Sequence, residues 1–191
     1  MKDKRYLLQN NEQAEHLGKI IAWCHMYYRD EFGFLLLNKK DKLDYYSQQN
    51  TFIKNKTTAL TVYNEMTKRT PLWIRLSFAI RDKISSLAGV EKINGFSGGH
   101  LEKNVQEGSS IDFFKIIRIS DNELCLLSED IHLTVLVSLN VLSSDNQGKG
   151  DKVTVTASVI THNFFGKMYM IPVSLAHSII VNSMLRKMTL P

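Results

Sequence analysis

The sequence has 191 residues, the length of one ordinary domain, and its 43% hydrophobic and 23% charged residues exclude a disordered, collagen-like or coiled-coil chain. Its two cysteines, Cys24 and Cys125, lack the spacing of paired ligands, which excludes a zinc ribbon and a disulfide framework. The net charge is +5, but the basic residues form separate clusters without a docking helix or an aromatic platform, so we expect no nucleic-acid partner.

The chain carries no pattern for export or for crossing a bilayer. Its first residues are charged and lack the apolar run of a signal peptide. No segment reaches about eighteen consecutive apolar residues, the length that spans a membrane. We therefore expect a cytoplasmic protein without a membrane span.

A helical pattern occupies the N-terminal part of the chain. Asn10 can cap a helix, and apolar residues recur every three or four positions from Ala14 to Tyr28. This pattern predicts an amphipathic helix that ends near Gly33. We assign residues 1–40 to a helical N-terminal extension and residues 41–191 to the main domain.

One strand and two helices are predicted next. Residues 44–53 have the composition of a strand, and a second helix can begin at Thr57 or Thr58. Pro71 suits the first position of a third helix, because proline there gives up no needed donor, and Gly89 is a plausible end of that helix.

The second half of the chain changes to a period of two residues. Every odd position from 131 to 141 is apolar, which predicts an antiparallel sheet with one buried face. A long apolar helix follows at residues 164–188, and Pro172 must kink or restart it because proline removes a backbone donor. The predicted strands of this half are residues 111–119, 123–128, 131–142 and 152–162.

This order of elements predicts an α+β fold rather than a parallel doubly wound sheet, because strands and helices do not alternate strictly. We expect a curved antiparallel sheet that grips the long C-terminal helix, with an extra N-terminal helix.

The last two predicted strands bring two histidines together. If their connecting loop is centred on Gln147, Leu142 faces Lys152 and His132 faces His162. Side chains directly opposite each other lie about 4.5–5.5 Å apart at Cβ, which lets two imidazoles share a proton or a metal ion. The alternation places both histidines on the polar face, where a structural or exposed pair is the simpler interpretation.

Several short motifs, in this order and spacing, resemble the largely bacterial domain-of-unknown-function family DUF2867. The motifs are PLWIR at 71–75, IRD at 80–82, DIHL at 130–133, HN at 162–163, GK at 166–167, Tyr169, Pro172, and His177 with Ile180 and Val181. The resemblance covers roughly residues 44 to 188 and leaves out the first forty.

The resemblance implies a relation to the helix-grip superfamily, which includes START lipid-binding domains, polyketide cyclases and the birch-pollen allergen. Such a fold has a sheet wrapped around a C-terminal helix with an apolar cavity between them. It implies no substrate and no catalytic residues, because the superfamily includes carriers, enzymes and proteins with filled cavities.

Aromatic, basic and histidine side chains are the candidate ligand-binding residues. Arg75 can hold an acidic ligand group or form an ion pair that fixes its helix, and Trp73 can line a cavity or fill a core. His177 on the last helix is expected to be a satisfied core or surface histidine. The candidates are Tyr45, Trp73, Arg75, His132, His162 and Tyr169.

A glycine-rich motif at residues 95–99 matches the nucleophile elbow of serine hydrolases, with Ser97 as the nucleophile. A polar loop follows it where the elbow requires a helix, so we expect a flexible flap instead. We expect no catalytic residue, no metal and no cofactor.

The leading functional hypothesis is binding of a small hydrophobic molecule in a cavity between sheet and C-terminal helix, without catalysis. Two alternatives stay open. One is a cyclase- or hydratase-like enzyme with His132 or His162 as general acid–base. The other is an interaction module whose N-terminal helix binds a partner or a second copy, which would make a homo-oligomer.

Overall fold

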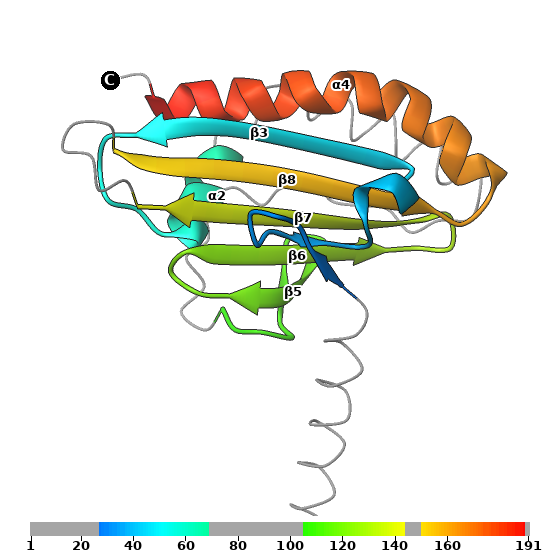
Figure 1. The fold of residues 1–191 in the computed structure, drawn as a ribbon, viewed down its shortest axis with the longest axis horizontal. Coiled ribbons are helices and arrows are strands. Elements are labelled where there is room, and N and C mark those ends of the chain that lie inside the picture. Colours follow the sequence, from blue (N-terminus) through cyan, green and yellow to red (C-terminus); the bar gives the residue numbers. More distant parts are fainter. Residues whose placement is uncertain (1–26, 69–104, 144–149, 190–191) are drawn as a thin grey trace, which may run out of the picture.

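The computed structural model describes residues 27–68, 105–143 and 150–189 of the chain. These residues build a six-stranded antiparallel sheet with the order β3-β8-β7-β6-β5-β4 (Figure 1). The strands are β3 (Tyr45–Ile53), β4 (Ser110–Ile111), β5 (Phe114–Ile119), β6 (Glu123–Glu129), β7 (Leu133–Leu142) and β8 (Asp151–Thr161). The predicted α+β class, the antiparallel sheet and the long C-terminal helix are confirmed.

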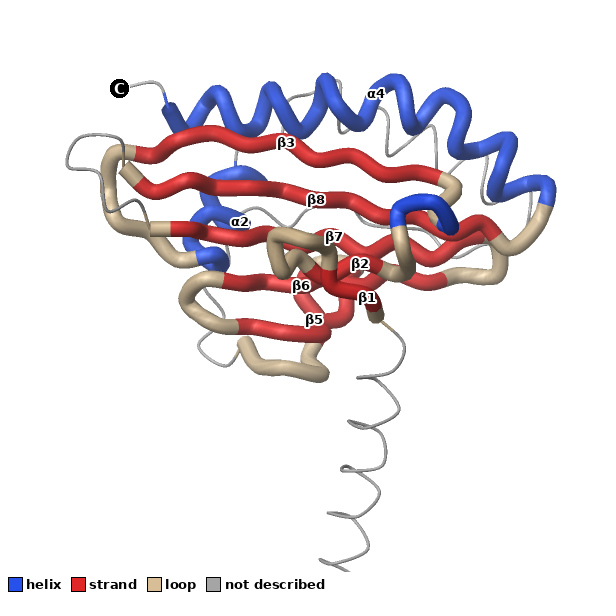
Figure 2. The backbone as a smooth tube through the Cα atoms, in the orientation of Figure 1, coloured by secondary structure: helices blue, strands red, loops and turns tan. Residues whose placement is uncertain are grey.

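Two α-helices and a small hairpin complete the described part of the fold (Figure 2). Helix α4 (Phe164–Thr189) lies against β3 and β8, and helix α2 (Ala59–Lys68) packs on the same side of the sheet. The hairpin of β1 (Tyr28–Arg29) and β2 (Leu35–Leu36) lies on the opposite side and is followed by the 3-10 turn η1 (Lys40–Lys42). The third predicted helix lies outside the described residues.

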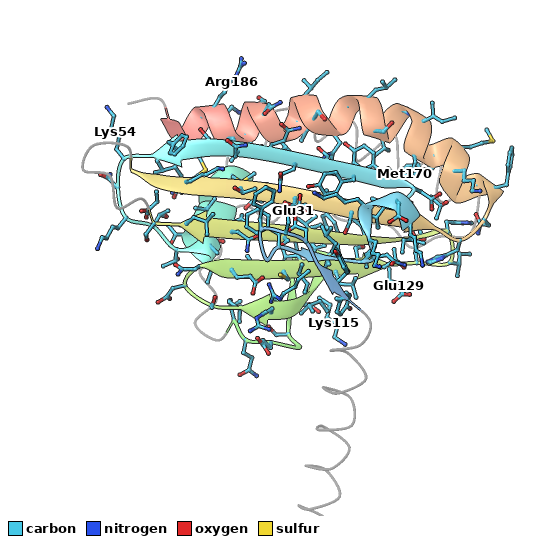
Figure 3. The ribbon with its side chains drawn as sticks, in the orientation of Figure 1. Glu31, Lys54, Lys115, Glu129, Met170 and Arg186 are labelled. Carbon is cyan, nitrogen blue, oxygen red and sulfur yellow. The ribbon has the colours of Figure 1, made fainter. Side chains whose placement is uncertain are left out.

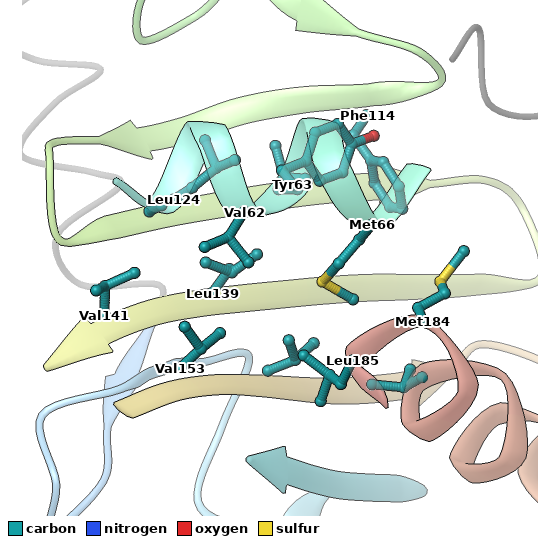
Figure 4. Packing of buried hydrophobic residues seen from close by; sticks show 14 of the residues in the cluster. Val62, Tyr63, Met66, Phe114, Leu124, Leu139, Val141, Val153, Met184 and Leu185 are labelled. Atoms are coloured by element: carbon teal, nitrogen blue, oxygen red, sulfur yellow. The ribbon is translucent and has the colours of Figure 1, made fainter. Parts of the chain in front are cut away.

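The main core fills the space between the inner face of the sheet, which we define as the face turned toward α2 and α4, and these two helices. Odd-numbered residues of β7 and β8, among them Leu139, Val141, Val153 and Val155, point into this core, as their alternation predicted. Figure 4 shows Val62 of α2 above Leu139, Met66 farther along the same helix, and Leu185 of α4 in the same core as Val153. Burial of these apolar side chains is the main source of stability of the fold.

Helix α2 begins where the sequence indicates a cap. The Thr58 hydroxyl accepts the backbone N–H of Thr61 at 3.2 Å, which satisfies one of the free donors at the helix start. The Ala59 N–H donates to the Asp121 carbonyl at 2.7 Å, so the turn between β5 and β6 holds the helix start. Of the two candidates in the sequence, Thr57 and Thr58, the residue that caps α2 is therefore Thr58.

Helix α4 is 26 residues long and continuous across Pro172. The helix is long and apolar enough to cross a membrane, by length and composition alone. Met170, Val181 and Leu185 of α4 pack into the core, but only 22% of the apolar window of this helix is buried. The absence of a membrane span therefore stays a prediction.

The outer face of the sheet, which lies under the β1–β2 hairpin, is buried as well. Ser138, Thr156 and Ser158 on this face are 0% exposed, although the alternation predicted only one buried face. Their hydroxyls have partners: that of Ser158 accepts the Leu37 N–H at 3.1 Å, that of Ser138 donates to the Asn140 side-chain oxygen at 2.8 Å, and that of Thr156 accepts the Gln48 amide at 3.3 Å. These hydrogen bonds offset the cost of burying the serine hydroxyls, whereas the Thr154 hydroxyl on the same face is buried without a partner among the described residues.

The predicted N-terminal helix does not reach Gly33. Residues 1–26 lie outside the described part of the chain, but Tyr28 and Arg29 form strand β1. The Asp30 carboxylate accepts the N–H groups of Phe32 and Phe34 at 3.0 and 2.9 Å, and Gly33 has a φ of +80°. These features make a tight turn that ends any helix before it, because a left-handed residue breaks the helical hydrogen-bond pattern.

The strand predicted at residues 111–119 is two strands. Asp112 has a φ of 53° and starts a two-residue turn between β4 and β5. Its carboxylate accepts a hydrogen bond from the Tyr63 hydroxyl of α2 at 2.6 Å; burial raises the pKa of that tyrosine, and this hydrogen bond raises it further. Aspartate tolerates this left-handed conformation better than most residues. The turn therefore needs no glycine, and the alternating sequence pattern shows no break where the two strands are separated.

The buried thiol of Cys125 is expected to be unreactive in the folded protein. Burial and the nearby Glu123 carboxylate raise its pKa to about 12, so the thiolate is about one part in 10⁴ at pH 8. In a Cys24→Ser background, a thiol reagent should modify Cys125 only at the rate of unfolding, and urea should restore full reactivity. Native-state labelling as fast as that of a free cysteine would contradict this burial.

Candidate functional site

The predicted pairing of the last two strands is confirmed. Leu142 lies opposite Lys152, and Leu133 lies opposite Thr161. One step beyond this ladder, the His162 N–H donates to the His132 carbonyl at 2.7 Å, so the two histidines are neighbours at the ends of β7 and β8.

The two imidazoles bind different partners. His132 Nδ1 lies 3.1 Å from the Asn163 side-chain oxygen, and its ring lies 4.5 Å from that of Phe165. His162 is exposed, and its Nε2 lies 2.8 Å from the Thr134 hydroxyl. No metal-binding cluster of His, Cys, Asp or Glu occurs within residues 27–68, 105–143 and 150–189.

Asn163 connects this histidine corner to helix α4. Its side-chain oxygen accepts the Gly166 N–H at 3.0 Å, as a helix cap does, and its amide donates to the Ile131 carbonyl at 2.9 Å. The His132 ring is therefore one part of the joint between the β6–β7 turn and the start of α4, which fits the structural interpretation of this histidine.

A second group of predicted residues lies between β3 and α4. Tyr45, at the start of β3, and Tyr169 in α4 are half-buried and pack against one cluster of Leu133, Val159 and Met170. Figure 3 labels Met170, whose helix α4 runs alongside β3. Val135 and Val173 pack against the same cluster and are also half-buried. The sheet and the helix thus bring together side chains more than 100 residues apart.

His177 supplies a polar group within this region. Its Nδ1 lies 3.3 Å from the Tyr45 hydroxyl, and the two rings meet edge to face with centroids 5.6 Å apart. Burial lowers the pKa of His177, which favours a neutral ring whose Nδ1 can accept the tyrosine proton. Ser47 and Gln49 continue the polar edge along β3, with the Gln49 amide 3.2 Å from the Ser47 hydroxyl.

We therefore define the candidate site as the region between β3, β7 and α4 that is lined by half-buried apolar and aromatic side chains around one tyrosine–histidine pair. Its residues are Tyr45, Val135, Tyr169, Val173 and His177. Chemically, the arrangement offers apolar surface and one hydroxyl–imidazole hydrogen-bonding unit.

The stability of the fold is expected to fall as the pH drops below the ordinary pKa of histidine, about 6.5. His177 has a lowered pKa in the folded state, so the unfolded chain binds its proton first and the free energy of unfolding decreases with falling pH. Above pH 7 the contribution is constant, because His177 is neutral in both states. Urea titrations of wild type and His177→Gln across this range should show their stability difference shrinking toward acid; a constant difference would contradict the burial of a neutral ring.

The predicted site residues fall into three groups. Tyr45 and Tyr169 come together between sheet and helix, whereas His132 and His162 lie at the strand ends. Trp73 and Arg75 lie outside the described residues, as does the glycine motif with Ser97. The sequence analysis expected His177 to be a histidine with its hydrogen bonds satisfied, and its partner is the Tyr45 hydroxyl. The only sequence signal for this residue was its position in a motif of the family.

An ion cluster on the outer face has no counterpart in any sequence pattern. The Glu123 carboxylate of β6 accepts hydrogen bonds from Nη1 and Nη2 of Arg29 at 2.9 and 3.2 Å, and it forms an ion pair with Nε of Arg118 at 2.9 Å. This paired hydrogen bond raises the pKa of Arg29 and ties the β1 hairpin to the sheet. Arg29 and Glu123 are too far apart in the chain for their contact to be read from spacing.

The fold and the site define an α+β protein in which one face of an antiparallel sheet is covered by a long C-terminal helix. The chain matches the family model DUF2867, described as a protein of unknown function, over residues 39–184, and it belongs to that family. The search of curated proteins and the search of solved structures gave no match.

Proposed function

We propose that the chain is a helix-grip domain that binds a small, largely apolar molecule between the inner face of the sheet and helix α4. The observation that carries this proposal is the Tyr45–His177 pair, 3.3 Å between oxygen and nitrogen, set among half-buried apolar side chains. Sites for small molecules commonly combine apolar walls with a few placed polar groups.

The half-buried side chains support this proposal. Val135 lies in β7, a central strand of the sheet, yet it is not fully covered, unlike Leu139 on the same face of the strand at 2% exposed. Tyr169 and Val173, one helical turn apart on α4, are likewise half-buried. Apolar surface left uncovered in this way gains free energy when an apolar molecule covers it, about 25 cal/mol per Å².

The polar pair sets the chemistry expected of the ligand. With a neutral imidazole, the Tyr45 hydroxyl donates to Nδ1 and keeps its oxygen lone pairs for a ligand donor. A ligand with one hydroxyl or amine group on an apolar body fits these groups. A strongly acidic or highly charged ligand does not, because this region offers no cation among its five defining residues.

Two measurements test the proposal. Native mass spectrometry of the purified chain should detect a retained apolar molecule, and the neutral fluorophore N-phenyl-1-naphthylamine should bind the delipidated protein. Val135→Phe should weaken fluorophore binding about tenfold or more by occupying the space. The matched control Ile131→Phe, at a residue that is 69% exposed, should not.

A more conservative variant keeps the test decisive if Val135→Phe folds poorly. Tyr45→Phe removes only the hydroxyl and should weaken binding of a hydroxylated apolar probe, such as a naphthol, more than binding of naphthalene. Absence of a retained molecule together with no fluorophore binding would refute the proposal, and so would binding that neither substitution changes.

The acid–base alternative rests on His132, whose buried Nε2 has no hydrogen-bond partner among the described residues. The imidazole lies at the end of β7 and packs against the Phe165 ring at an interplanar angle of 42°, and His162 is exposed. A reaction there would take place at the strand ends rather than between sheet and helix. We rank this function second, and His132→Gln should leave fluorophore binding unchanged.

A cytoplasmic location remains an expectation. The interaction alternative concerns the N-terminal segment. Residues 27–40 pack on the sheet, since Leu35 and Leu37 contact the cluster around Cys125 and Leu136. A deletion that tests the segment should therefore end at residue 26. Loss of a partner or of self-association in that deletion, with unchanged fluorophore binding, would favour this alternative.

A further inference from the structure

The side of α4 that faces away from the sheet carries a line of large apolar residues exposed to solvent. We call it the α4 stripe. Phe164 is 75% exposed, Met168 55%, Ile171 66%, Leu175 74% and Ile179 64%. The steps of four, three, four and four residues place all five on one side of the helix.

The area of the stripe is large for a monomer surface. A fully exposed large side chain presents on the order of 200 Å², so the α4 stripe and the adjoining Ile131, 69% exposed, amount to roughly 800 Å². Ile131 adjoins the helix start because its carbonyl accepts the Asn163 amide at 2.9 Å. A standard protein interface buries about 800 Å² on each partner.

The spacing of the stripe has a symmetry of its own. It is arranged evenly about the Ile171–Pro172 bond, so that Phe164 and Ile179 lie equally far from this centre, as do Met168 and Leu175. Pro172 is exposed on the same helix and extends the apolar centre. An antiparallel copy of α4 would therefore place large apolar residues against large apolar residues along about 22 Å.

The charges on α4 agree with this arrangement. The helix carries no Asp or Glu. Its Lys167 is exposed near the N-terminal end of the stripe, and Arg186 and Lys187 lie beyond the C-terminal end of the stripe. In an antiparallel pair centred on Ile171, Arg186 and Lys187 of each copy lie beyond the end of the partner helix, so that they do not face the same residues of the other copy. In a parallel pair they would meet, and like charges would oppose the contact.

We propose that the α4 stripe is the contact surface for a second copy of this chain, packed antiparallel about a two-fold axis at Ile171–Pro172. In this register Phe164 faces Ile179 and Met168 faces Leu175 of the second copy, so that each copy buries the same apolar residues, as an isologous contact requires. The proposal does not depend on the proposed ligand site, because the stripe lies on the opposite side of α4 from Met170 and Val181.

Sedimentation velocity of the full chain over a hundredfold concentration range tests the proposal. Wild type should sediment as a dimer at the upper concentrations. Leu175→Lys keeps helix propensity and should raise the dissociation constant about a hundredfold or more, because it puts a charge in the buried contact. The control Leu142→Lys, at an exposed residue of β7 off the stripe, should leave the dimer intact.

Disulfide trapping tests the antiparallel geometry itself. In a Cys24→Ser background, Ile171→Cys places the two thiols next to the two-fold axis and should cross-link on mild oxidation. Asn182→Cys should not, because the two copies of position 182 would lie about 30 Å apart along the helix axes.

Several outcomes would overturn the proposal. A monomeric wild type would do so, whether it also co-sediments with anionic phospholipid vesicles or not; in the first case the stripe would be a membrane-binding surface. A dimer that survives Leu175→Lys, or that cross-links through position 182 rather than 171, would show that copies meet elsewhere or in a different register.

Discussion

Gly150→Ala is expected to destabilise the fold by about 3 kcal/mol, with no direct effect on the candidate site. A Cβ at this position would lie 2.1 Å from the Ile53 carbonyl oxygen and 2.8 Å from the Lys54 Cα, both of which are backbone atoms. The φ of Gly150 is +69°, a conformation that costs an alanine about 1 kcal/mol even in open space. The first strand of the sheet, β3, ends at Ile53, so relief of the clash must separate β3 from β8.

Gly108 offers a matched control for this prediction. Its φ is +86°, but a Cβ added there would have no atom within 4 Å. Gly108→Ala should therefore cost only the conformational part, about 1 kcal/mol. Urea denaturation of both variants measures the difference. Equal losses at the two positions would show that Gly150 does not lie against the end of β3.

Gly166→Ala is expected to lower the free energy of unfolding by about 2 kcal/mol. In an exposed helix interior this substitution stabilises by about 1 kcal/mol, because glycine is the poorer helix former. At Gly166 the added Cβ would lie 2.3 Å from the His132 carbonyl oxygen and 3.3 Å from the Thr161 Cβ. The steric conflict outweighs the gain in propensity, so the sign of the effect is reversed.

The clash at Gly166 would act on the joint that fixes α4 to the sheet. The same His132 carbonyl accepts the His162 N–H at 2.7 Å, and the Gly166 N–H donates to the Asn163 cap at 3.0 Å. Lys167→Ala, on the next and exposed residue, should change stability by less than about 0.5 kcal/mol. A Gly166→Ala variant as stable as wild type would contradict this close packing.

Local sequence patterns predicted the elements that depend on them. The alternation of residues 131–142 and 152–162 indicated β7 and β8, and the centre of their loop gave the correct register, because the position of the loop and the period of two fix which residues pair. Thr58 and the apolar pattern after it indicated α2. The long apolar segment after Asn163 indicated α4, although Pro172 lies inside it.

The sequence could not predict which contacts join distant segments. The even face of β7 and β8 looks like a solvent face, yet the hairpin of β1 and β2 covers it and supplies partners such as the Leu37 N–H for its hydroxyls. The end of the predicted N-terminal helix was wrong for a similar reason, since the Asp30 turn and pairing of Tyr28 with Leu36 outweigh helical periodicity.

The candidate site shows the same division. Tyr45 and Tyr169 could be selected by residue type and motif, but the sequence does not reveal that His177 faces Tyr45, because that contact depends on how α4 crosses β3. The histidine pair was correctly placed at the ends of neighbouring strands. Its side chains take separate partners, Asn163 and Thr134, which strand register alone does not determine.

Binding of an apolar molecule between the sheet and the inner side of α4 can be tested by nuclear magnetic resonance. The experiment measures intermolecular nuclear Overhauser effects between methyl-labelled protein and N-phenyl-1-naphthylamine. We expect contacts from the fluorophore to the methyl groups of Val135 and Val173, which share one cluster between β7 and α4. Contacts confined to Leu175 and Ile179 on the opposite side of the helix, or none to either pair, would contradict the proposed function.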